Sequence, residues 1–376
     1  MLKLTPPMGW NSWNTFGEDI NEALILETAD KLVESGLHKK GYEYLVIDDC
    51  WSMKERDANG RLVADPVKFP HGMKAVADYV HQKGLKFGMY SCAGNLTCAG
   101  YPGSFEHEFI DAKIFAEWGV DYLKYDYCYH SPIIHGKYLY RRMGIALENC
   151  GRDILFSACS WGADETHEWI KETSSSIWRS TGDIFDTWDS VKSLVKQQEK
   201  LLPYQGVGCF NDMDMLIVGM YGKGNVGLAG CNDIQYRTHF SIWAFMGSPL
   251  MIGCDIRSMS HATLETLTNE ELIAINQDPA CRQPYKLSGI WGGDDLITYA
   301  KQLANGDLAI GMFNLSEEKC VAHINMDEFG LPLSTGQTLL LHDVWTKEDS
   351  SVKNGTIHKE LAAYDCAVYR AKVVSL

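Results

Sequence analysis

Two acidic residues of this sequence stand where a pair of carboxyl groups could share one reaction. Asp126 closes the apolar run "DYLKYD", and Asp183 comes two residues after the run "SSIWRST". Paired carboxyl groups about 5 to 5.5 Å apart can cleave a glycosidic bond, one attacking the anomeric carbon and the other serving as acid and then base. We therefore expect glycosidic chemistry from Asp126 and Asp183.

Further polar and aromatic side chains follow the other apolar runs. A single acidic residue at a strand end is more often a helix N-cap than a catalyst, but repetition across several strands favours a site. Flat aromatic faces suit the apolar faces of sugar rings, Asp48 and Asp49 offer adjacent acceptors for sugar hydroxyls, and Lys124 would keep a carboxylate ionised or bind hydroxyls. The run ends carry Trp13, Asp48, Asp49, Trp51, Tyr90, Lys124, Trp161, Arg179, Phe210, Asp212 and Asp214.

Other chemistries lack their residues. The sequence has no HExxH, its first run has no HxH, and its twelve His are dispersed, so we expect no metal. It also has no GxSxG elbow for a nucleophilic serine. Only Lys124 and Arg179 provide positive charge at the run ends, which is little for binding phosphate. Carboxylates with aromatic walls remain.

The elements that position these residues alternate between short apolar runs and longer helical patterns. About eight such units fill the first 280 residues, which predicts a (β/α)8 barrel with its active site at the C-terminal ends of the strands. Alternate strands place side chains in one layer of a barrel, so Asp126 after the fourth strand and Asp183 after the sixth should face each other. Lys124 and Asp126 should point into the mouth, and Tyr125 toward the helices.

The pattern of apolar and polar residues changes after "INQDPACRQ". Short, partly alternating runs separated by Gly, Asn, Asp and Ser predict an antiparallel β domain, a sandwich, after the barrel. We place the catalytic barrel at residues 1–282 and the β domain at residues 283–376.

The composition of the chain limits the classes of binding partner that we expect. A net charge of −15 disfavours nucleic acid and anionic membranes, and no stretch approaches the roughly 20 apolar residues of a membrane helix. The start "MLKLTPPMGW" lacks the features of a signal peptide, and the twelve cysteines form no CxxC pair, so we expect a cytoplasmic protein. The assembly state stays open, with a homo-oligomer among the options.

Six motifs resemble a known family. "PPMGWNSW", "IDDCW", "GMYSCAGNLTCAGYPGSF", "WGVDYLKYDYCY", "WRSTGD" and "NDMDML" are similar, in order and spacing, to the strand ends of glycoside hydrolase family 27, the α-galactosidases and α-N-acetylgalactosaminidases. The resemblance runs from Pro6 to about Asp278 and more loosely into the β domain.

The resemblance implies a retaining exo-glycosidase that acts on terminal α-linked galactose without a cofactor. It makes Asp126 the nucleophile and Asp183, four residues after Arg179, the acid/base. The Asp pair of "IDDCW" suits the axial 4-hydroxyl and the 6-hydroxyl of galactose. The resemblance assigns substrate contacts to Trp13, Asp48, Asp49, Tyr90, Cys98, Lys124, Arg179, Asp214 and Met215.

Cysteines and two substitutions depart from the family pattern. Secreted relatives pair the cysteines that match Cys98 and Cys128, whereas Cys50 and Cys159 lack their usual partners here. The resemblance thus leaves the oxidation state of Cys98 and Cys128 open. Phe210 and Met213 replace a usual Trp and Pro, which keeps an aromatic wall but changes its shape.

The loop "CSWGAD" bears on the sugar. Ser160 and Ala163 stand where α-galactosidases of the family commonly carry larger residues, and they leave room for a 2-acetamido group. Plain α-galactosidase activity is our first reading, with α-N-acetylgalactosaminidase or dual specificity as the alternative. A non-catalytic galactose-binding barrel and a metal-dependent hydrolase are alternatives from other classes. The natural aglycone and linkage stay open.

Overall fold

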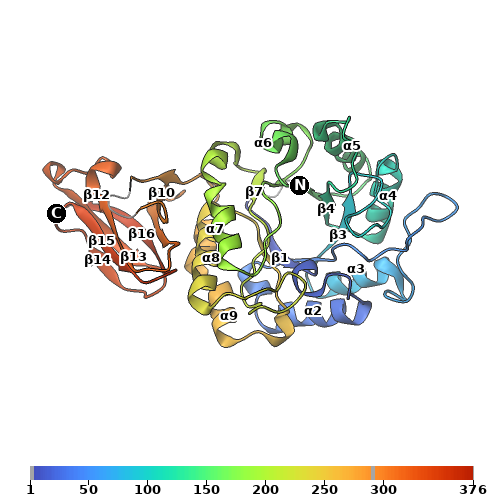
Figure 1. The fold of residues 1–376 in the computed structure, drawn as a ribbon, viewed down its shortest axis with the longest axis horizontal. Coiled ribbons are helices and arrows are strands. Elements are labelled where there is room, and N and C mark those ends of the chain that lie inside the picture. Colours follow the sequence, from blue (N-terminus) through green and yellow to red (C-terminus); the bar gives the residue numbers. More distant parts are fainter. Residues whose placement is uncertain (1–3, 289–292, 376) are drawn as a thin grey trace. The chain divides into compact units, whose positions relative to one another are not determined.

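Eight parallel strands form a barrel in the computed structural model, which describes residues 4–288 and 293–375 (Figure 1). Their order in the sheet is β7-β6-β5-β4-β3-β2-β1-β8, and a parallel bridge from Leu216, beyond β7, to Ile252 brings the two edges together. The predicted barrel is confirmed, and each predicted run contains one strand. The strands are β1 (Met8–Asn11), β2 (Tyr44–Val46), β3 (Lys86–Cys92), β4 (Tyr122–Asp126), β5 (Leu155–Cys159), β6 (Ile177–Arg179), β7 (Phe210–Asp212) and β8 (Leu250–Ile252).

Helices connect these strands, and local signals set their ends. The Asn21 side chain accepts a hydrogen bond from Leu24 N and caps α2, while Gly119 ends α4 in the left-handed conformation. Within the described residues no helix is both long and apolar enough to span a bilayer. The helices are α1 (Trp13–Phe16), α2 (Glu22–Glu34), α3 (Gly72–Gln82), α4 (Glu108–Trp118), α5 (Gly136–Glu148), α6 (Thr166–Trp169), α7 (Trp188–Lys196), α8 (Asp233–Met246), α9 (His261–Leu267) and α10 (Glu270–Asn276).

The C-terminal strands form two antiparallel sheets, of order β14-β13-β16-β11-β10-β9 and β12-β15. Apolar side chains from both sheets, such as Ile310 and Ile357, belong to one buried cluster, so the sheets pack face to face as a sandwich, as predicted. The strands are β9 (Tyr285–Lys286), β10 (Leu296–Gln302), β11 (Leu308–Asn314), β12 (Cys320–Asn325), β13 (Gln337–Asp343), β14 (Asp349–Ser351), β15 (Thr356–Leu361) and β16 (Cys366–Ser375).

The chain divides into two compact units, and the division does not follow chain order. One unit holds Met1–Gly230 and Ser248–His261, and the other holds Cys231–Gly247 and Ala262–Leu376. Inside the second unit, Lys301 Nζ donates to Phe245 O at 2.7 Å, so α8 packs with the strands of the sandwich. The expected boundary at residue 282 thus lies within a region that packs as one unit.

Candidate active site

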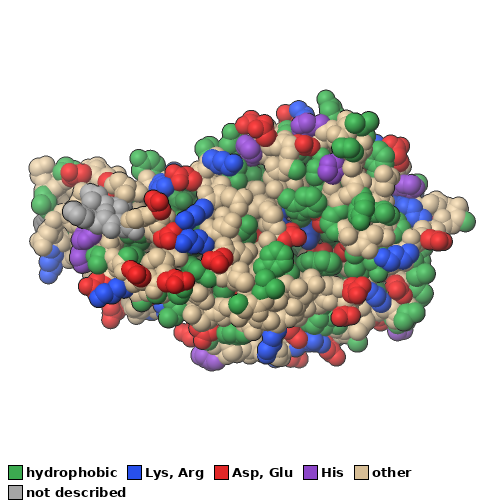
Figure 2. Space-filling model, viewed as in Figure 1, with side chains coloured by type: hydrophobic (Ala, Val, Ile, Leu, Met, Phe, Trp, Pro, Cys, Tyr) green, Lys and Arg blue, Asp and Glu red, His purple; other side chains and the backbone are tan. Residues whose placement is uncertain are grey.

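Neighbouring strands of the barrel unit place the predicted residues at one end. Asp126 pairs in register with Cys92 of β3 and Cys159 of β5, and Arg179 of β6 pairs with Asp212 of β7. In Figure 2, charged side chains of both signs lie among hydrophobic ones near the middle of this unit. Tyr125 points toward the surrounding helices, as the alternation predicted. The centroid of its ring lies 5.7 Å from that of Tyr140 on α5.

Asp126 is a buried and fixed carboxylate. Asp126 is the last residue of β4 and is 6% exposed. Oδ2 accepts a hydrogen bond from Tyr90 Oη at 2.9 Å, and Oδ1 accepts one from Tyr127 N at 2.9 Å. Burial raises the pKa of Asp126 to about 6, although the charge of Lys124 and these hydrogen bonds act in the opposite direction. The carboxylate is therefore ionised above that pH and is held in one orientation.

Lys124 forms its ion pair with Asp48. The Lys124 ammonium lies 2.9 Å from Asp48 Oδ2, and the same oxygen accepts a hydrogen bond from Asn11 Nδ2 at 2.7 Å. Burial disfavours the ammonium, but the attraction of Asp48 outweighs it and keeps the pKa of Lys124 above its usual value. Lys124 acts on Asp126 through its positive charge, which favours the ionised carboxylate.

Both carboxylate oxygens of Asp49 accept hydrogen bonds from backbone N–H groups. Its Oδ1 accepts from Cys50 N at 2.7 Å and its Oδ2 from Ala99 N at 3.0 Å, and the residue is 2% exposed. Burial raises its pKa. The expected sugar contact through Asp49 would have to share these oxygens, whereas the structure shows Asp49 holding the loop that carries Cys98.

Arg179 joins two further carboxylates. One nitrogen, Nη2, donates to Asp183 Oδ1 at 2.8 Å and to Asp214 Oδ2 at 2.6 Å. Burial raises the pKa of Asp214 to about 6, while the positive charge of Arg179 opposes this shift. Asp214 also has a φ of 80°, a left-handed conformation that is strained for a non-glycine residue and concentrates at functional sites.

Asp183 differs from Asp126 in exposure. Its side chain is 62% exposed, against 4% for the Arg179 side chain that holds it. A carboxyl group in this position is in direct contact with solvent. The structure thus offers one buried, fixed carboxylate and one accessible, tethered carboxylate.

Aromatic and apolar side chains surround these charges. Trp13 is half-buried against the cluster that contains Met215 and Met251, and Trp51 Nε1 donates to Tyr90 O at 2.9 Å. Tyr90 is 1% exposed and Phe210 is fully buried. Phe210 therefore supports the wall from behind and does not form its surface.

The two residues expected beside the sugar's 2-position differ in placement. Ser160 is fully buried, and its hydroxyl is hydrogen-bonded to Thr166 Oγ1. Ala163 opens a short 3-10 helix, Ala163–Glu165, and is partly exposed. Only Ala163 presents its side chain to solvent, and that side chain is a single methyl group.

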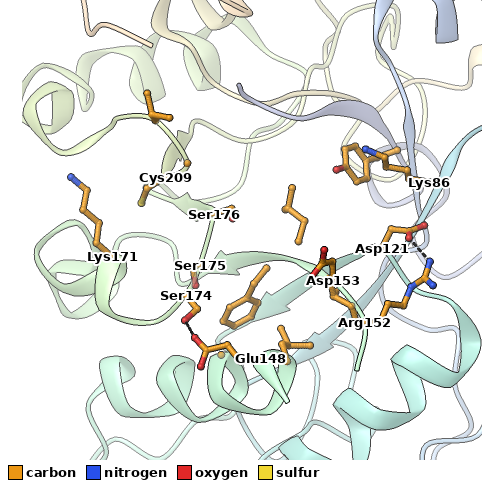
Figure 3. Close-up of a pocket in the computed structure, with 18 of the residues that line it drawn as sticks. Lys86, Asp121, Glu148, Arg152, Asp153, Lys171, Ser174, Ser175, Ser176 and Cys209 are labelled. Atoms are coloured by element: carbon orange, nitrogen blue, oxygen red, sulfur yellow. Dashed lines mark hydrogen bonds and ion pairs between the residues drawn. The ribbon is translucent and has the colours of Figure 1, made fainter. Parts of the chain in front are cut away.

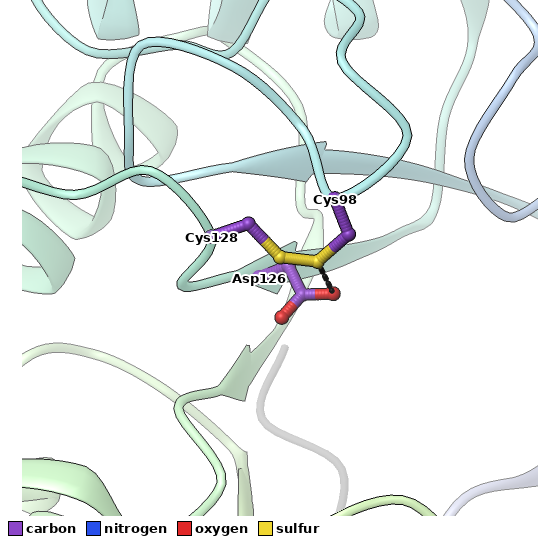
Figure 4. A group of neighbouring side chains, drawn as sticks. All are labelled: Cys98, Asp126 and Cys128. Atoms are coloured by element: carbon purple, nitrogen blue, oxygen red, sulfur yellow. Dashed lines mark hydrogen bonds between the residues drawn. A yellow bond between two sulfur atoms is a disulfide. The ribbon is translucent and has the colours of Figure 1, made fainter.

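Cys98 and Cys128 are joined as a disulfide beside Asp126 (Figure 4). Their Cα atoms are 5.1 Å apart, and Cys98 Sγ lies 3.5 Å from Asp126 Oδ2. The other ten cysteines, including Cys50 and Cys159, form no disulfide in the described part of the chain. The bond that the sequence left undecided is thus present in the structure.

A large cavity lies at the opposite end of the barrel, where the strands begin. It measures about 1580 Å³ and is lined by residues such as Lys86, Asp121 and Arg152 (Figure 3). Several of its charges form ion pairs: Arg152 Nη2 lies 2.5 Å from Asp121 Oδ1, and Lys86 Nζ lies 3.1 Å from Glu43 Oε2. Beneath the mouth, a cavity of about 20 Å³ is lined by Lys124, Arg179, Asp212, Asp214, Met215 and others. The convergent acids of the mouth make it the candidate active site.

Three contributors were not predicted individually. Asn11 binds Asp48 through Nδ2, Ser12 Oγ accepts from Asp48 N at 3.0 Å, and Cys159 Sγ lies 3.7 Å from Arg179 Nη1. Asn11 and Ser12 stand near the end of the first predicted run, two positions and one position before Trp13, and this proximity was the available signal. Cys159 carried no signal of its own.

The chain matches known protein families along most of its length. Residues 5–278 match the family model described as "Alpha galactosidase A", and residues 293–371 match the "Alpha galactosidase C-terminal beta sandwich domain". An α-galactosidase of Cyamopsis tetragonoloba is 44% identical over 369 residues, covering 98% of this chain and 86% of its own.

Solved structures agree. α-Galactosidase I from Mortierella vinacea superposes with a TM-score of 0.90 at 33% identity, covering 98% of this chain and 97% of its own. An α-galactosidase of Saccharomyces cerevisiae solved with raffinose has a TM-score of 0.90 at 30% identity, covering 99% and 98% of the two chains. On these matches, the protein is a glycoside hydrolase and belongs to glycoside hydrolase family 27, the α-galactosidase family.

Proposed function

We propose that this protein hydrolyses terminal α-linked D-galactose from oligosaccharides or glycoconjugates with retention of anomeric configuration. The observation that carries the proposal is the contrast between Asp126, buried and held by Tyr90 and Tyr127, and Asp183, exposed and tethered to Arg179. A nucleophile must be oriented before it attacks, whereas an acid/base must exchange protons with water. The two carboxyl groups fit these different tasks.

In the first step, an Asp126 carboxylate oxygen attacks the anomeric carbon of galactose. The bond to the leaving oxygen breaks as Asp183 donates a proton to it, and a galactosyl ester of Asp126 forms. The Tyr90 hydroxyl and the Tyr127 N–H, which bind the ionised carboxylate, keep its oxygens in place before the attack.

In the second step, Asp183 takes a proton from water and the resulting hydroxide attacks the same carbon. The ester bond breaks and Asp126 leaves as a carboxylate, so two inversions give net retention. The solvent exposure of the Asp183 side chain admits this water.

The substrate is a small galactoside in this proposal. Asp48 and Lys124 form an ion pair at the mouth whose remaining lone pairs and protons suit the 4- and 6-hydroxyls. Trp13, which is only half-buried, supplies a flat face for the ring. A relative from S. cerevisiae was solved with raffinose, which supports an oligosaccharide as the substrate class.

Two asparagine variants test the proposal. Asp126→Asn should abolish hydrolysis of an aryl α-galactoside, and Asp183→Asn should lower kcat by about 10²- to 10⁴-fold, less for a good leaving group. Asp189→Asn is a matched control, because Asp189 is an exposed carboxylate on α7 nearby in sequence. Near-ultraviolet circular dichroism would verify folding. Wild-type turnover in the Asp126 variant would contradict the proposal.

The anomeric form of the first galactose released tests retention separately. ¹H NMR during early turnover should show α-galactose before mutarotation produces the β anomer. β-Galactose as the first product would assign an inverting mechanism instead.

α-N-Acetylgalactosaminidase activity is the second candidate. It is favoured by Ala163, whose single methyl group leaves the partly exposed loop after β5 open. Hydrolysis rates of an aryl α-galactoside and an aryl α-N-acetylgalactosaminide, measured side by side, decide between the two.

A further inference from the structure

Three ligand-capable atoms converge at the mouth of the barrel in a way that glycosidic cleavage does not require. The sulfurs of Cys98 and Cys128 and a carboxylate oxygen of Asp126 all lie within 4.8 Å of one another (Figure 4). Two sulfurs and one carboxylate oxygen at this spacing are a ligand set for a soft divalent ion, with metal–sulfur bonds of about 2.3 Å for zinc. The disulfide withholds the sulfurs from any such ion.

We propose that reduction of the Cys98–Cys128 disulfide creates a binding site for a thiolate-preferring divalent cation, such as Zn²⁺ or Cd²⁺, and that the bound ion blocks Asp126. The blocking part rests on the proposed function, in which Asp126 is the nucleophile. The metal site itself depends only on the positions of the three side chains.

The backbone fixes both cysteines independently of their bond. A Cβ added at Gly94 would lie 2.1 Å from Cys128 O, so glycine lets the segment leading to Cys98 pass directly against the Cys128 backbone. Asn95 N also donates to Tyr129 O at 3.3 Å, and Ala99 N donates to Asp49 Oδ2. The two sulfurs should therefore stay close after reduction.

Access and position favour the ion. Cys98 is exposed and Cys128 partly exposed, while Asp126 is buried at the bottom of the group. An ion arriving from solvent meets the sulfurs first and then the carboxylate. By occupying a lone pair of Asp126, it would remove the electrons that attack the anomeric carbon.

Metal binding requires two chemical steps, reduction of the disulfide and exchange of thiol protons for the cation. A dithiol reductant gives two electrons and two protons to the disulfide, forming two thiols and its own cyclic disulfide. The cation then displaces one proton from each thiol and binds the two thiolates and the carboxylate, releasing two protons to water. Hard ions such as Mg²⁺ prefer oxygen ligands and should not compete.

The test compares the oxidised enzyme with enzyme reduced by dithiothreitol and desalted without oxygen. Cys150, Cys281 and Cys320 are first changed to Ser, because these cysteines are partly exposed, lie outside the disulfide and would add background. Cd²⁺ is the probe, since its bond to thiolate gives an ultraviolet charge-transfer band. Mg²⁺ is the matched control ion.

We expect reduced enzyme to gain a band that saturates at one Cd²⁺ per chain and to lose hydrolysis of the aryl α-galactoside by at least about tenfold relative to reduced enzyme without Cd²⁺. Oxidised enzyme should show neither effect, and Mg²⁺ should change neither form. The same Cd²⁺ response in both forms, or a band without loss of hydrolysis, would overturn the proposal.

Variants identify the ligands and separate this proposal from the function. Reduced Cys98→Ser/Cys128→Ser should lack the band and keep its residual hydrolysis unchanged by Cd²⁺; full inhibition there would refute the site. If that variant does not fold, the comparison of the oxidised and reduced forms still decides. Reduced Asp126→Asn should keep the band with Cd²⁺ affinity lower by about tenfold or more. Hydrolysis by Asp126→Asn would refute the proposed nucleophile, whereas Cd²⁺ affinity equal to that of wild type would remove Asp126 from the metal site.

Discussion

Tyr90 Oη donates a 2.9 Å hydrogen bond to Oδ2 of Asp126, across the neighbouring strands β3 and β4. Burial raises the pKa of Tyr90 well above its usual value, so the phenol remains a proton donor throughout the working pH range. Because the hydrogen bond is made to the ionised carboxylate, it favours ionisation and lowers the pKa of Asp126. Tyr90 thereby acts as a positioning residue for Asp126, the proposed nucleophile.

Tyr90→Phe should move the acid limb of kcat/KM to higher pH. The pKa of Asp126 is about 6 with the phenol present, and loss of this hydrogen bond raises it further. The carboxylate is then protonated, and the enzyme inactive, over a wider acidic range. A profile of kcat/KM against pH measures the shift. Tyr138→Phe on α5, at an exposed tyrosine, is the control and should leave the limb in place; an unmoved limb in the Tyr90 variant would exclude the coupling.

Lys124→Met should destabilise the barrel unit. It would leave the Asp48 carboxylate, whose side chain is 2% exposed, without its ammonium partner. Loss of one partner of a buried ion pair costs about 3–5 kcal/mol. Urea unfolding followed by tryptophan fluorescence measures the change, and Asp48→Asn/Lys124→Met should recover part of the loss. A midpoint equal to that of wild type in the single variant would show that the pair adds nothing to stability.

Ala163→Leu should change sugar selectivity more than catalysis. A larger side chain on this partly exposed position would crowd a 2-acetamido group but not a 2-hydroxyl. The ratio of kcat/KM for aryl α-N-acetylgalactosaminide over aryl α-galactoside should fall by about 10-fold or more, the lower end of the range for a misfit of one carbon atom. Ala58→Leu, on an exposed turn of the same unit, is the control. An unchanged ratio would place the 2-substituent elsewhere.

Lys301→Met tests a buried charge in the sandwich unit. Burial lowers the pKa of Lys301 to about 8, against 10.5 for an unperturbed lysine. As pH rises from 8 to 10.5, the folded state has already lost the proton that the unfolded state keeps, so wild type gains stability relative to the variant, on the order of 3 kcal/mol. Urea titrations of both proteins at several pH values measure this difference. A difference that is flat across the window would mean that the folded pKa is normal.

Much of the fold followed from local pattern. Each of the eight apolar runs of the barrel contains a strand, because a parallel strand covered by helices on one side and a packed interior on the other must be apolar along its length. Two strands of the sandwich have no such pattern, β9 and β14. β9 has two residues and β14 reads "DSS" with all three exposed, so neither has an apolar pattern to detect.

The position of the site also followed from the sequence, while its internal partners did not. Arg179 and Asp214, both expected at strand ends, are joined by a hydrogen bond of 2.6 Å. The link from Lys124 to Asp48 spans 76 residues, and nothing in the spacing distinguishes Asp48 from Asp49 as its partner. That choice depends on which side chain the turn after β2 directs inward and which it directs toward Ala99.

Burial was likewise decided by the tertiary structure. Ser160 and Ala163 looked equivalent in "CSWGAD", yet the loop folds so that the serine hydroxyl binds Thr166 and only the alanine is partly exposed. Trp161, which lies between them, has a φ of 58°. The residue types of the loop do not predict this left-handed backbone conformation.

The sequence by itself determined the alternation of strands and helices, the end of the barrel where acids gather, and the family, because each of these depends on residue type at regular spacing. The tertiary structure alone decided which carboxylate is buried, which is exposed, and that Cys98 and Cys128 are bonded to each other beside Asp126. Those properties depend on distances between residues far apart in the chain, and only the packed barrel sets such distances.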